Sequence, residues 1–536
     1  MLLSGRHVSR GGRPFVHEAF ESHAARRPGA PALTCGPRAL TYGELNTRAN
    51  RLARFLRERG VGPGSVVGVC LDRSLEMMVG ILATLKAGAA YAPLDTTYPT
   101  ARLQLMFSQV PEMKLVLAAP ETWEIAGAGE AVAELVDVTR AEAACAGLSG
   151  ADLRLELDPR DLCYVVFTSG STGTPKATAV RHDGWYNLLA WCAADFELGP
   201  HSSGLLLSPF GFDITQRGLM TPLLTGAVLH LLPSRNFDGM LATRLIRELK
   251  VRTLHCAPSA LYVLMGRAED GAEQALRSVD YVFVGGEAIA PAKVAGWAEL
   301  AHRDSRLVNV YGVAECTDVA TFHVLTDYAG YAEAGVPIGR PIHNIDVRLV
   351  EDDLSPVAPG EIGELCISGI GVGEGYLNDP GLTAERFVRL GAVDPETGEQ
   401  TRLYRTGDLA RVSPAGELMY VGRADSQVKI RGMRVDLGDI ETALCVDPRI
   451  SQAVVVPERD GGRVVGIAAY VVPEPGSAAA FDARAVRADL LTRVPAHMVP
   501  GRFGVVADFP LSPNGKVDRN ALAARAAAGA AAAGIR

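Results

Sequence analysis

The sequence predicts an α/β protein with a large N-terminal domain of α/β sheets and helices, a small β-rich lobe, and a smaller mobile α+β C-terminal domain. In the N-terminal part, short apolar segments with the length of buried strands alternate with amphipathic helical segments. From about residue 345 the pattern changes to short strands broken by glycine. Because no segment recurs at a fixed period, a solenoid is excluded.

The N-terminal pattern predicts its elements one after another. The first helix is expected at residues 46–59, where alanine and leucine side chains share one face and Gly60 follows as a stop signal. A second helix is expected at residues 74–87. Strands are expected at residues 65–71, 114–118, 162–167, 204–207, 228–232, 253–257 and 280–284.

The C-terminal part of the sequence predicts a lobe and a separate domain. In the β-rich lobe, strands are expected at residues 346–350, 363–368 and 404–408. Beyond the lobe, strands at residues 453–456 and 464–472 are mixed with helices at residues 440–444 and 485–493. We therefore expect an N-terminal core at residues 1–424, a C-terminal domain at residues 425–521 and an alanine-rich tail at residues 522–536.

Length and composition exclude several classes of protein. A chain of 536 residues is too long for one hydrophobic core, and 48% hydrophobic with 21% charged residues is ordinary for a globular protein. The net charge of −8 argues against nucleic acid or an anionic membrane as partner. No apolar passage is a clean membrane span and the first residues lack a signal-peptide core, so a cytoplasmic location is expected. The nine cysteines show no CxxC pair, which argues against a zinc site or a disulfide framework.

Residues 168–176, with the sequence TSGSTGTPK, predict a loop that holds a polyphosphate. The glycines let the backbone approach an anion, the hydroxyls add donors and Lys176 adds a point charge. A Walker A loop needs a Gly-Lys pair, but Thr174 and Pro175 precede the lysine here. The alternative is a flexible polar linker, which the apolar strand predicted at residues 162–167 disfavours.

A series of motifs in a fixed order extends this prediction over nearly the whole chain. The motifs are LTYGEL at residues 40–45, LKAGAAY at 85–91, the loop at 168–176, NVYG at 309–312, GEL at 363–365, YRTGDL at 404–409, GRADSQVKIRG at 422–432 and PNGKVDR at 513–519. Together they resemble an adenylation domain of the nonribosomal peptide synthetase type. This is a branch of the adenylate-forming enzymes, which include acyl-CoA ligases and luciferases.

The resemblance implies that a carboxylate attacks the α-phosphate of ATP, giving an acyl-adenylate and pyrophosphate, with ATP and Mg²⁺ as cofactors. Glu315 matches the carboxylate that holds Mg²⁺, a hard ion suited to oxygen ligands. Asp408 and Arg423 match contacts to the ribose, although a buried aspartate satisfied by the backbone is the alternative for Asp408. The other nucleotide-binding positions implied are Thr168, Ser169, Gly170, Thr172, Gly173, Lys176 and Tyr311.

Two positions in the C-terminal domain carry roles implied by the same resemblance. Lys516 matches the lysine that bridges the substrate carboxylate and the nucleotide, although Asn514-Gly515-Lys516 alone would indicate an exposed turn. Asp425 matches the hinge about which the domain swings between the two half-reactions.

The sequence departs from the family pattern at two places. Val313-Ala314 stands where the family usually has Pro-Thr, so a threonine hydroxyl expected near the phosphate is missing and nucleotide contact is weakened or moved to another donor. Ala177 follows Lys176 where glycine is usual, which is tolerable if its φ is negative. The first departure leaves open a different class of function, a catalytically weak nucleotide-binding regulator.

Spacing from the motifs gives the expected substrate pocket. Its lining residues are Asp213, Ile214, Arg217, His255, Phe283, Gly285, Val310, Asp318, Val319 and Lys516. Asp213 matches the carboxylate that pairs with the substrate ammonium in amino-acid-activating members. A buried unpaired aspartate would be costly, so an amino acid is favoured over the substrate of an acyl-CoA or aryl-acid ligase.

The charged pocket residues favour an acidic amino acid. Arg217 with His255 is suited to a second carboxylate, as in domains that activate the side-chain carboxyl of aspartate-like or glutamate-like residues. Asp318 instead fits a rotated ammonium or a basic side chain such as ornithine or arginine. A further alternative is that Arg217 and Asp318 pair with each other and leave a smaller polar site.

Several motifs of larger assemblies are not found in the sequence. There is no Gly-Gly-x-Ser segment after residue 519, no HHxxxDG motif and no GxSxG elbow. The chain is therefore expected to be free-standing and to pass its acyl group to a separate phosphopantetheinylated carrier protein.

Overall fold

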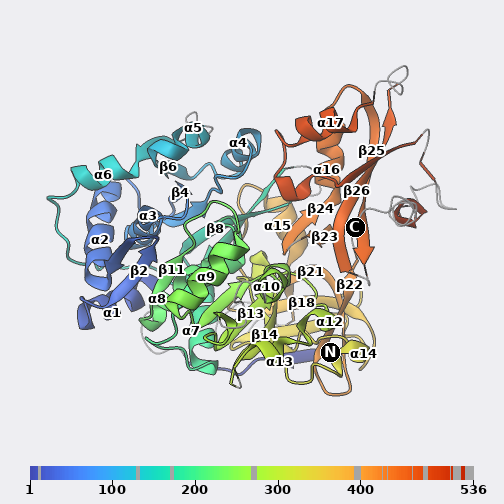
Figure 1. Ribbon diagram of the computed structural model, residues 1–536, viewed down its shortest axis with the longest axis horizontal. Coiled ribbons are helices and arrows are strands. Elements are labelled where there is room, and N and C mark those ends of the chain that lie inside the picture. The colour runs from blue at the N-terminus through green and yellow to red at the C-terminus, as the bar shows by residue number, and fades with distance from the viewer. Residues whose placement is uncertain are drawn as a thin grey trace.

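The chain folds into a large N-terminal part and a small C-terminal part, which stands to one side in orange to red (Figure 1). The structure is a computed structural model. It describes residues 1–9, 14–127, 133–169, 174–266, 275–302, 304–391, 400–424, 427–430, 432–460, 463–474, 481–506, 509–510, 519 and 521–524. This arrangement confirms the predicted fold class.

Two large sheets, mostly parallel, form the N-terminal part. The first has the order β16 (Arg340–Pro341), β15 (Thr321–Val324), β14 (Arg306–Tyr311), β13 (Tyr281–Gly285), β12 (Thr253–Cys256), β10 (Gly204–Leu206), β11 (Leu229–Leu231), β2 (Pro31–Cys35) and β3 (Arg38–Thr41). The second has the order β19 (Gly375–Tyr376), β9 (Lys176–Arg181), β8 (Leu162–Thr168), β5 (Ala90–Pro93), β4 (Val66–Cys70), β6 (Met113–Ala118) and β7 (Glu134–Asp137). Each of the seven predicted strands is present, with ends that differ by at most two residues.

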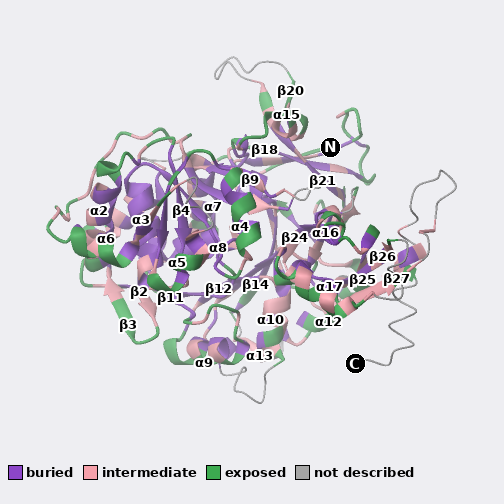
Figure 2. Cartoon of the chain, turned by 90° about the horizontal axis from the view of Figure 1, so that it is seen from above, coloured by how far each residue is buried: buried purple, intermediate pink, exposed green. Residues whose placement is uncertain are grey.

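Buried helices join the two sheets into one core. They are α1 (Val16–Arg26), α2 (Tyr42–Glu58), α3 (Leu75–Lys86), α7 (His182–Asp195) and α8 (Asp213–Thr225). Figure 2 shows α3, α7 and strand β4 as largely buried. A capping box starts α2, because the Thr41 side chain accepts from Glu44 N while the Glu44 side chain accepts from Thr41 N. Two predicted helices are thus confirmed, and α2 begins four residues earlier than expected.

The remaining helices of the N-terminal part lie around these sheets and beside the lobe, with α9 and α10 in front of the central strands (Figure 1). They are α4 (Thr100–Ser108), α5 (Trp123–Ala126), α6 (Val138–Ala144), α9 (Gly239–Leu249), α10 (Pro258–Met265), α12 (Pro291–Val294), α13 (Trp297–Leu300), α14 (Tyr331–Ala334) and α15 (Pro380–Arg386). Among the described residues, no helix has the length and apolar character needed to cross a membrane.

The β-rich lobe is an antiparallel sheet. Its strands are β1 (Leu2–Ser4), β17 (Ile345–Val350), β18 (Gly363–Gly369), β21 (Thr401–Val412), β20 (Phe387–Leu390) and β22 (Leu418–Arg423). The three strands predicted here are present. Strand β1 was not predicted, because a strand of three residues that pairs with β17, more than 340 positions away, leaves no local pattern.

The C-terminal part has a hydrophobic core of its own. A hairpin of β23 (Gln427–Ile430) and β24 (Met433–Asp436) faces the N-terminal part, and a sheet of β25 (Ile450–Asp460), β26 (Arg463–Pro473) and β27 (Arg502–Val505) packs with α16 (Leu437–Leu444) and α17 (Ala483–Leu490). Gly432, with φ of +82°, lets the hairpin turn approach the core closely, since a Cβ there would lie 2.7 Å from Ala257 Cβ.

Candidate active site

A cavity of about 580 Å³ lies between the two parts of the chain. Its core side is built by residues that follow the carboxyl ends of strands β8, β10, β12, β13 and β14, the edge where α/β sheets usually bind ligands. Its other side is built by Lys429, Gly432, Met433 and Arg434 of the hairpin. The cavity therefore has walls from both parts of the chain.

The predicted phosphate loop starts at this cavity. Thr168 ends strand β8 and lines the cavity, and its buried Oγ1 has no hydrogen-bond partner among the described residues. Ser169 Oγ donates to Arg434 O and accepts from Asp436 N, both at 2.9 Å. Burial lowers the pKa of Lys176 at the start of β9, and the nearby Arg434 adds to this effect. The described part of the loop thus has a hydroxyl without a partner in the cavity wall, at Thr168, and a cation at its other end, Lys176.

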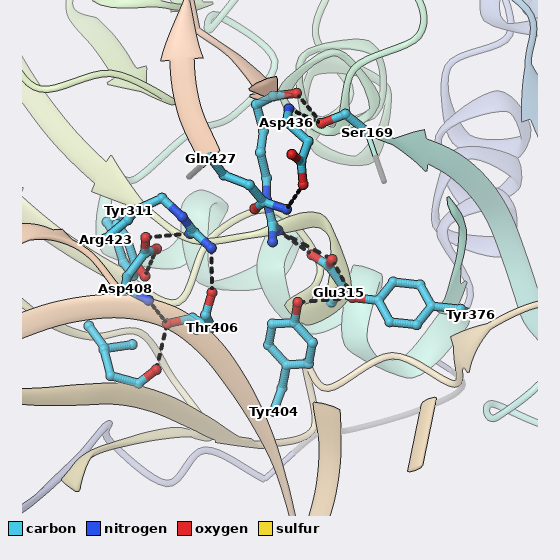
Figure 3. A network of polar contacts seen from close by, with 12 residues as sticks. Ser169, Tyr311, Glu315, Tyr376, Tyr404, Thr406, Asp408, Arg423, Gln427 and Asp436 are labelled. Carbon is cyan, nitrogen blue, oxygen red and sulfur yellow. Dashed lines mark hydrogen bonds and ion pairs between the residues drawn. The ribbon is translucent and has the colours of Figure 1, made fainter. Parts of the chain in front are cut away.

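Glu315 is a fully buried carboxylate on the short turn that follows β14. Tyr376 Oη donates to its Oε1 at 2.7 Å, and Arg434 Nη1 lies 3.2 Å from each carboxylate oxygen. Tyr404 Oη is 3.0 Å from Tyr376 Oη and extends this network (Figure 3). Burial alone would raise the pKa of Glu315, but the Arg434 guanidinium and the Tyr376 hydroxyl lower it overall. Glu315 is therefore ionised.

The surroundings of Glu315 fit a magnesium ion that takes most of its ligands from phosphate and water. No group of three or more histidine, cysteine, aspartate or glutamate residues is gathered for a metal in the described part of the chain. Mg²⁺ bound with a nucleotide typically uses one or two carboxylates together with phosphate oxygens. One ionised carboxylate beside a phosphate loop meets that requirement.

Asp408 lies in β21 directly opposite Arg423 of β22. Its Oδ1 accepts from Arg423 Nη1 at 2.5 Å and its Oδ2 accepts from Tyr311 Oη at 2.6 Å. Thr406 fixes this arrangement, because its Oγ1 accepts from Asp408 N at 2.9 Å and its carbonyl oxygen accepts from Arg423 (Figure 3). Three of the predicted nucleotide residues are thus in contact, and Asp408 is satisfied by side chains rather than by the backbone alone.

Asp213 is the first residue of helix α8 and lies in the cavity wall. In the described part of the chain, its carboxylate accepts a hydrogen bond from the neighbouring Ile214 N at 2.8 Å. Burial and the nearby Asp318 raise the pKa of Asp213 to about 7. A carboxylate in this state is stabilised by a cation, and a substrate ammonium would supply one.

Arg217 and Asp318 form a buried ion pair. Arg217 Nε donates to Asp318 Oδ2 at 2.6 Å, and the arginine side chain is fully buried. Thr317 and Asp318 both have positive φ, 62° and 68°, in the turn that brings Asp318 to the cavity wall. Burial raises the pKa of Asp318, and Arg217 opposes this rise. The pairing that the sequence left as an alternative is therefore present.

His255 is the second partner of Arg217. Arg217 Nη1 lies 2.9 Å from His255 Nδ1, and the imidazole stacks on Phe283 with ring centroids 4.8 Å apart. Because guanidinium can only donate, Nδ1 must accept and the imidazole proton must sit on Nε2. Burial, followed by the Arg217 charge, holds the pKa of His255 well below its usual value. Neither His255 Nε2 nor Arg217 Nη2 has a partner among the described residues.

The ten predicted pocket residues divide into three groups. Asp213, Ile214, Gly285, Val310 and Asp318 line the cavity. Arg217, His255, Phe283 and Val319 are buried outside its lining and reach it through Asp318 or the packing of the core. The tenth, Lys516, falls outside the described residues, and so do four of the other predicted site positions, namely Gly170, Thr172, Gly173 and Asp425.

Three residues of the site were not predicted as site residues, and two of them, Lys429 and Arg434, line the cavity. Arg434 and Tyr376 contact Glu315, and Lys429 lies with its Nζ 5.4 Å from the Tyr311 ring centroid. Burial lowers the pKa of Lys429, and Asp408 opposes the effect. A sequence signal existed for Lys429, because it is one of only seven lysines among 53 basic residues.

Sequence comparison shows to which known proteins the chain is similar. Residues 20–377 match the family of AMP-binding enzymes, and residues 439–516 match the C-terminal domain of AMP-binding enzymes. Tyrocidine synthase 3 of Brevibacillus parabrevis is 39% identical over 520 residues, 96% of this chain. The dimodular nonribosomal peptide synthase of Bacillus subtilis is 39% identical over 533 residues, 95% of this chain. The chain spans only 8% and 21% of the length of these two relatives.

Solved structures with the same fold superpose on most of the chain. Holo-PA1221, described as an NRPS protein containing adenylation and PCP domains, superposes with a TM-score of 0.79 at 27% identity, covering 96% of this chain and 84% of that one. The fused adenylation–PCP protein NpsA-ThdA from Klebsiella oxytoca has a TM-score of 0.79 at 24% identity, covering 91% and 93%. The chain therefore belongs to the family of AMP-binding enzymes, as an adenylation domain of the nonribosomal peptide synthetase type.

Proposed function

We propose that this protein is an ATP-dependent ligase that joins an amino acid to AMP and releases pyrophosphate. One observation carries the proposal: a single cavity is bordered by the acceptor for an ammonium, Asp213, and by the phosphate loop at Thr168. The buried carboxylates Glu315 and Asp408 stand in contact with residues of the same site. Their joint presence is what a reaction between an amino acid and ATP requires.

Each group has a role in the proposed adenylation. A substrate carboxylate oxygen forms a bond to the α-phosphorus of ATP while the bond between that phosphorus and the pyrophosphate oxygen breaks. Glu315 would hold Mg²⁺, which supplies charge neutralisation for the phosphates when bound. Asp408 and Arg423 would position the ribose, Asp213 would bind the ammonium, and Lys516 would bridge the carboxylate and the nucleotide.

We infer that the activated amino acid then passes to the phosphopantetheine thiol of a separate carrier protein. The thiolate forms a bond to the carbonyl carbon, and the bond from that carbon to the phosphate oxygen breaks, so AMP leaves. Support comes from holo-PA1221, an NRPS protein that contains adenylation and PCP domains. The proposed location of this chemistry is the cytoplasm.

We propose an acidic amino acid as the substrate, activated at either of its carboxyls. Support comes from two donors behind the pocket wall, Arg217 Nη2 and the protonated His255 Nε2, which have no partner among the described residues and both call for an acceptor group. A carboxylate can fill both donors. A basic substrate is less consistent with the structure, because Asp318 already has Arg217 as its cation.

Amino-acid-dependent ATP–pyrophosphate exchange tests the proposal. The panel pairs each acid with its amide, aspartate with asparagine and glutamate with glutamine, and adds 3-methylaspartate, ornithine, arginine and β-amino acids. We expect exchange with an acidic member and much less with its amide. Exchange with ornithine or arginine would overturn the substrate class alone. Absence of exchange with every amino acid, combined with thioester formation from a fatty or aryl acid, would overturn the whole proposal.

A further inference from the structure

The β23–β24 hairpin presents two cations side by side to the N-terminal core. Lys429 and Arg434 are direct partners in the antiparallel register, and both line the cavity. Like charges placed directly opposite each other destabilise a pair of strands. Negative charge from outside the hairpin would therefore stabilise it in this position.

The core supplies that negative charge. The carboxylate of Glu315 is fully buried and has both oxygens 3.2 Å from Arg434 Nη1. Asp408 and Asp213 attract the Lys429 ammonium across the same cavity. Each cation of the hairpin thus faces a carboxylate of the core, and the closest contact is made to the carboxylate proposed as the metal ligand.

Strand β24 also forms hydrogen bonds with Ser169, near the start of the predicted phosphate loop. Its Arg434 O and Asp436 N both bond the hydroxyl of Ser169. Arg434 Nε also donates to Gln427 Oε1 at 2.7 Å, which fixes the direction of the guanidinium toward Glu315. Strand β24 therefore contacts both Glu315, the carboxylate proposed to bind the metal, and the hydroxyl of Ser169, the loop residue after Thr168.

We propose that Arg434 is a positioning residue that takes the place of magnesium on Glu315, so that docking of the hairpin and metal binding at this carboxylate exclude each other. The inference rests on the proposed function, because it takes Glu315 as the metal ligand. A buried carboxylate without a cation is costly, and the guanidinium would remove this cost whenever no metal is bound. The docked arrangement would then follow adenylation and precede acyl transfer.

A second contact between the two parts provides a matched control. Arg102 of α4 lies 4.0 Å from Asp439 of α16, and both side chains are buried. This pair also joins the N-terminal part to the C-terminal part, but it contacts neither Glu315 nor Ser169 in the described structure. Arg102→Gln therefore weakens docking without freeing the metal carboxylate.

The interdomain distance can be followed in the full-length protein with two labels. Cys445, in the C-terminal part, is exposed, whereas the other eight cysteines are buried or half-buried. A second label is placed with Met240→Cys on α9, where the side chain is 62% exposed, in a Cys35→Ser background. Distance distributions from spin labels are recorded with chelator, with MgCl₂, and with NaCl at matched ionic strength, since salt alone screens charges.

In the parent protein we expect MgCl₂ to lower the ratio of docked to undocked molecules by about tenfold relative to matched NaCl, a typical coupling between two ligands. In Arg102→Gln the docked fraction should be lower, but the response to magnesium should persist. In Arg434→Gln the response to magnesium should be lost, because Glu315 is free in the docked state as well. Arg434→Lys keeps a cation and should keep part of the response, which covers the case that the glutamine variant fails to fold.

The inference would be overturned if MgCl₂ changed the ratio of docked to undocked molecules equally in Arg434→Gln and in the parent protein. It would also be overturned if MgCl₂ changed this ratio in the parent protein no more than NaCl does. ATP–pyrophosphate exchange by the parent protein separates this failure from failure of the proposed function. If exchange is normal but magnesium and docking do not compete, the role of Arg434 is refuted and the proposed function stands. Competition without exchange for any amino acid refutes the proposed function alone.

Discussion

Arg217 Nε and Asp318 Oδ2 are 2.6 Å apart in a buried ion pair behind the substrate cavity. The pair neutralises one cation and one anion, which leaves Asp213 as the carboxylate proposed to bind the substrate ammonium. Arg217 Nη2 and His255 Nε2, which have no partner in the described part of the chain, are the donors proposed to select the substrate side chain. The net charge of this pocket therefore depends on which residues form ion pairs, and not only on which charged residues are present.

Changing either member of the pair should move specificity in opposite directions. Asp318→Asn leaves the Arg217 charge uncompensated, so the ratio of kcat/KM for the acid over its amide should rise. Arg217→Gln removes the cation, and the ratio should fall by about 10–100-fold. General loss of stability affects both variants alike and cannot produce opposite changes. A shift of the two ratios in the same direction would contradict the proposed substrate class.

Activity should depend on pH through Asp213. Its pKa of about 7 in the empty site means that only the ionised form, which predominates above pH 7, can pair with the ammonium. We expect kcat/KM for the amino acid to rise with pH through this value. In Asp213→Asn, kcat/KM should fall by about 100-fold and this inflection should be lost. An unchanged inflection in the variant would assign it to another group.

The same group should affect stability. Because the folded-state pKa of Asp213 lies above its usual value of 3.8, its contribution is fully present below that value and is lost as pH rises through 7. At pH 8 the unliganded Asp213→Asn variant should therefore have a higher Tm than the parent protein. Saturating amino acid should reverse the order, because only the parent protein gains the ion pair.

The ribose contact can be tested with substrate analogues. Asp408→Asn should raise the KM for ATP by about tenfold, because it weakens charge-assisted acceptance from the ribose hydroxyls and releases Arg423. Deoxy-ATP should be a poorer substrate than ATP for the parent protein but nearly equal to ATP for the variant. Arg405→Gln, which breaks a pair with Glu364 on the neighbouring strand β18, serves as the control and should retain the discrimination.

Removal of the metal should stop the first half-reaction. Treatment with chelator should abolish ATP–pyrophosphate exchange, and added Mg²⁺ should restore it. Glu315→Gln should raise the magnesium concentration needed for half-maximal exchange by at least about tenfold, since one charged ligand is lost. An unchanged magnesium requirement would show that Glu315 is not the metal ligand.

Lys516→Ala should reduce exchange to background, whereas transfer of the acyl group from synthetic aminoacyl-AMP to a carrier protein should continue. The reason is that the lysine is assigned to the adenylation step and not to the attack by the thiol. Lys250→Ala, at the end of α9, is the control for loss of a lysine. Near-normal exchange in Lys516→Ala would refute the role.

The sequence predicted the fold well because the central strands are continuous apolar segments. The Thr41–Glu44 capping box was not used, and for this reason α2 begins four residues before its predicted start. The sequence also placed Tyr311, Asp408 and Arg423 in one site, since each is carried by a motif. Strand β1 was missed because its partner β17 is remote in sequence and its own three residues carry no periodic signal.

The partners of the charged residues could not be predicted in the same way. The pairing of Arg217 with Asp318 depends on two left-handed residues in the turn at 317–318, and φ angles are not visible in the sequence. The contact of Arg434 with Glu315 depends on where the C-terminal part docks. Both are long-range arrangements, set by packing and charge rather than by local pattern.

The most direct measurement uses aspartate or glutamate labelled with ¹⁸O in one carboxyl at a time, with mass spectrometry of the AMP released after the acyl group is transferred. If that carboxylate attacks the α-phosphorus, one labelled oxygen stays with AMP when the carbonyl–oxygen bond breaks. We expect labelled AMP from one of the two carboxyls, which also identifies the one that is activated. Unlabelled AMP from both substrates, or formation of ADP and phosphate in place of AMP, would contradict adenylation of an acidic amino acid.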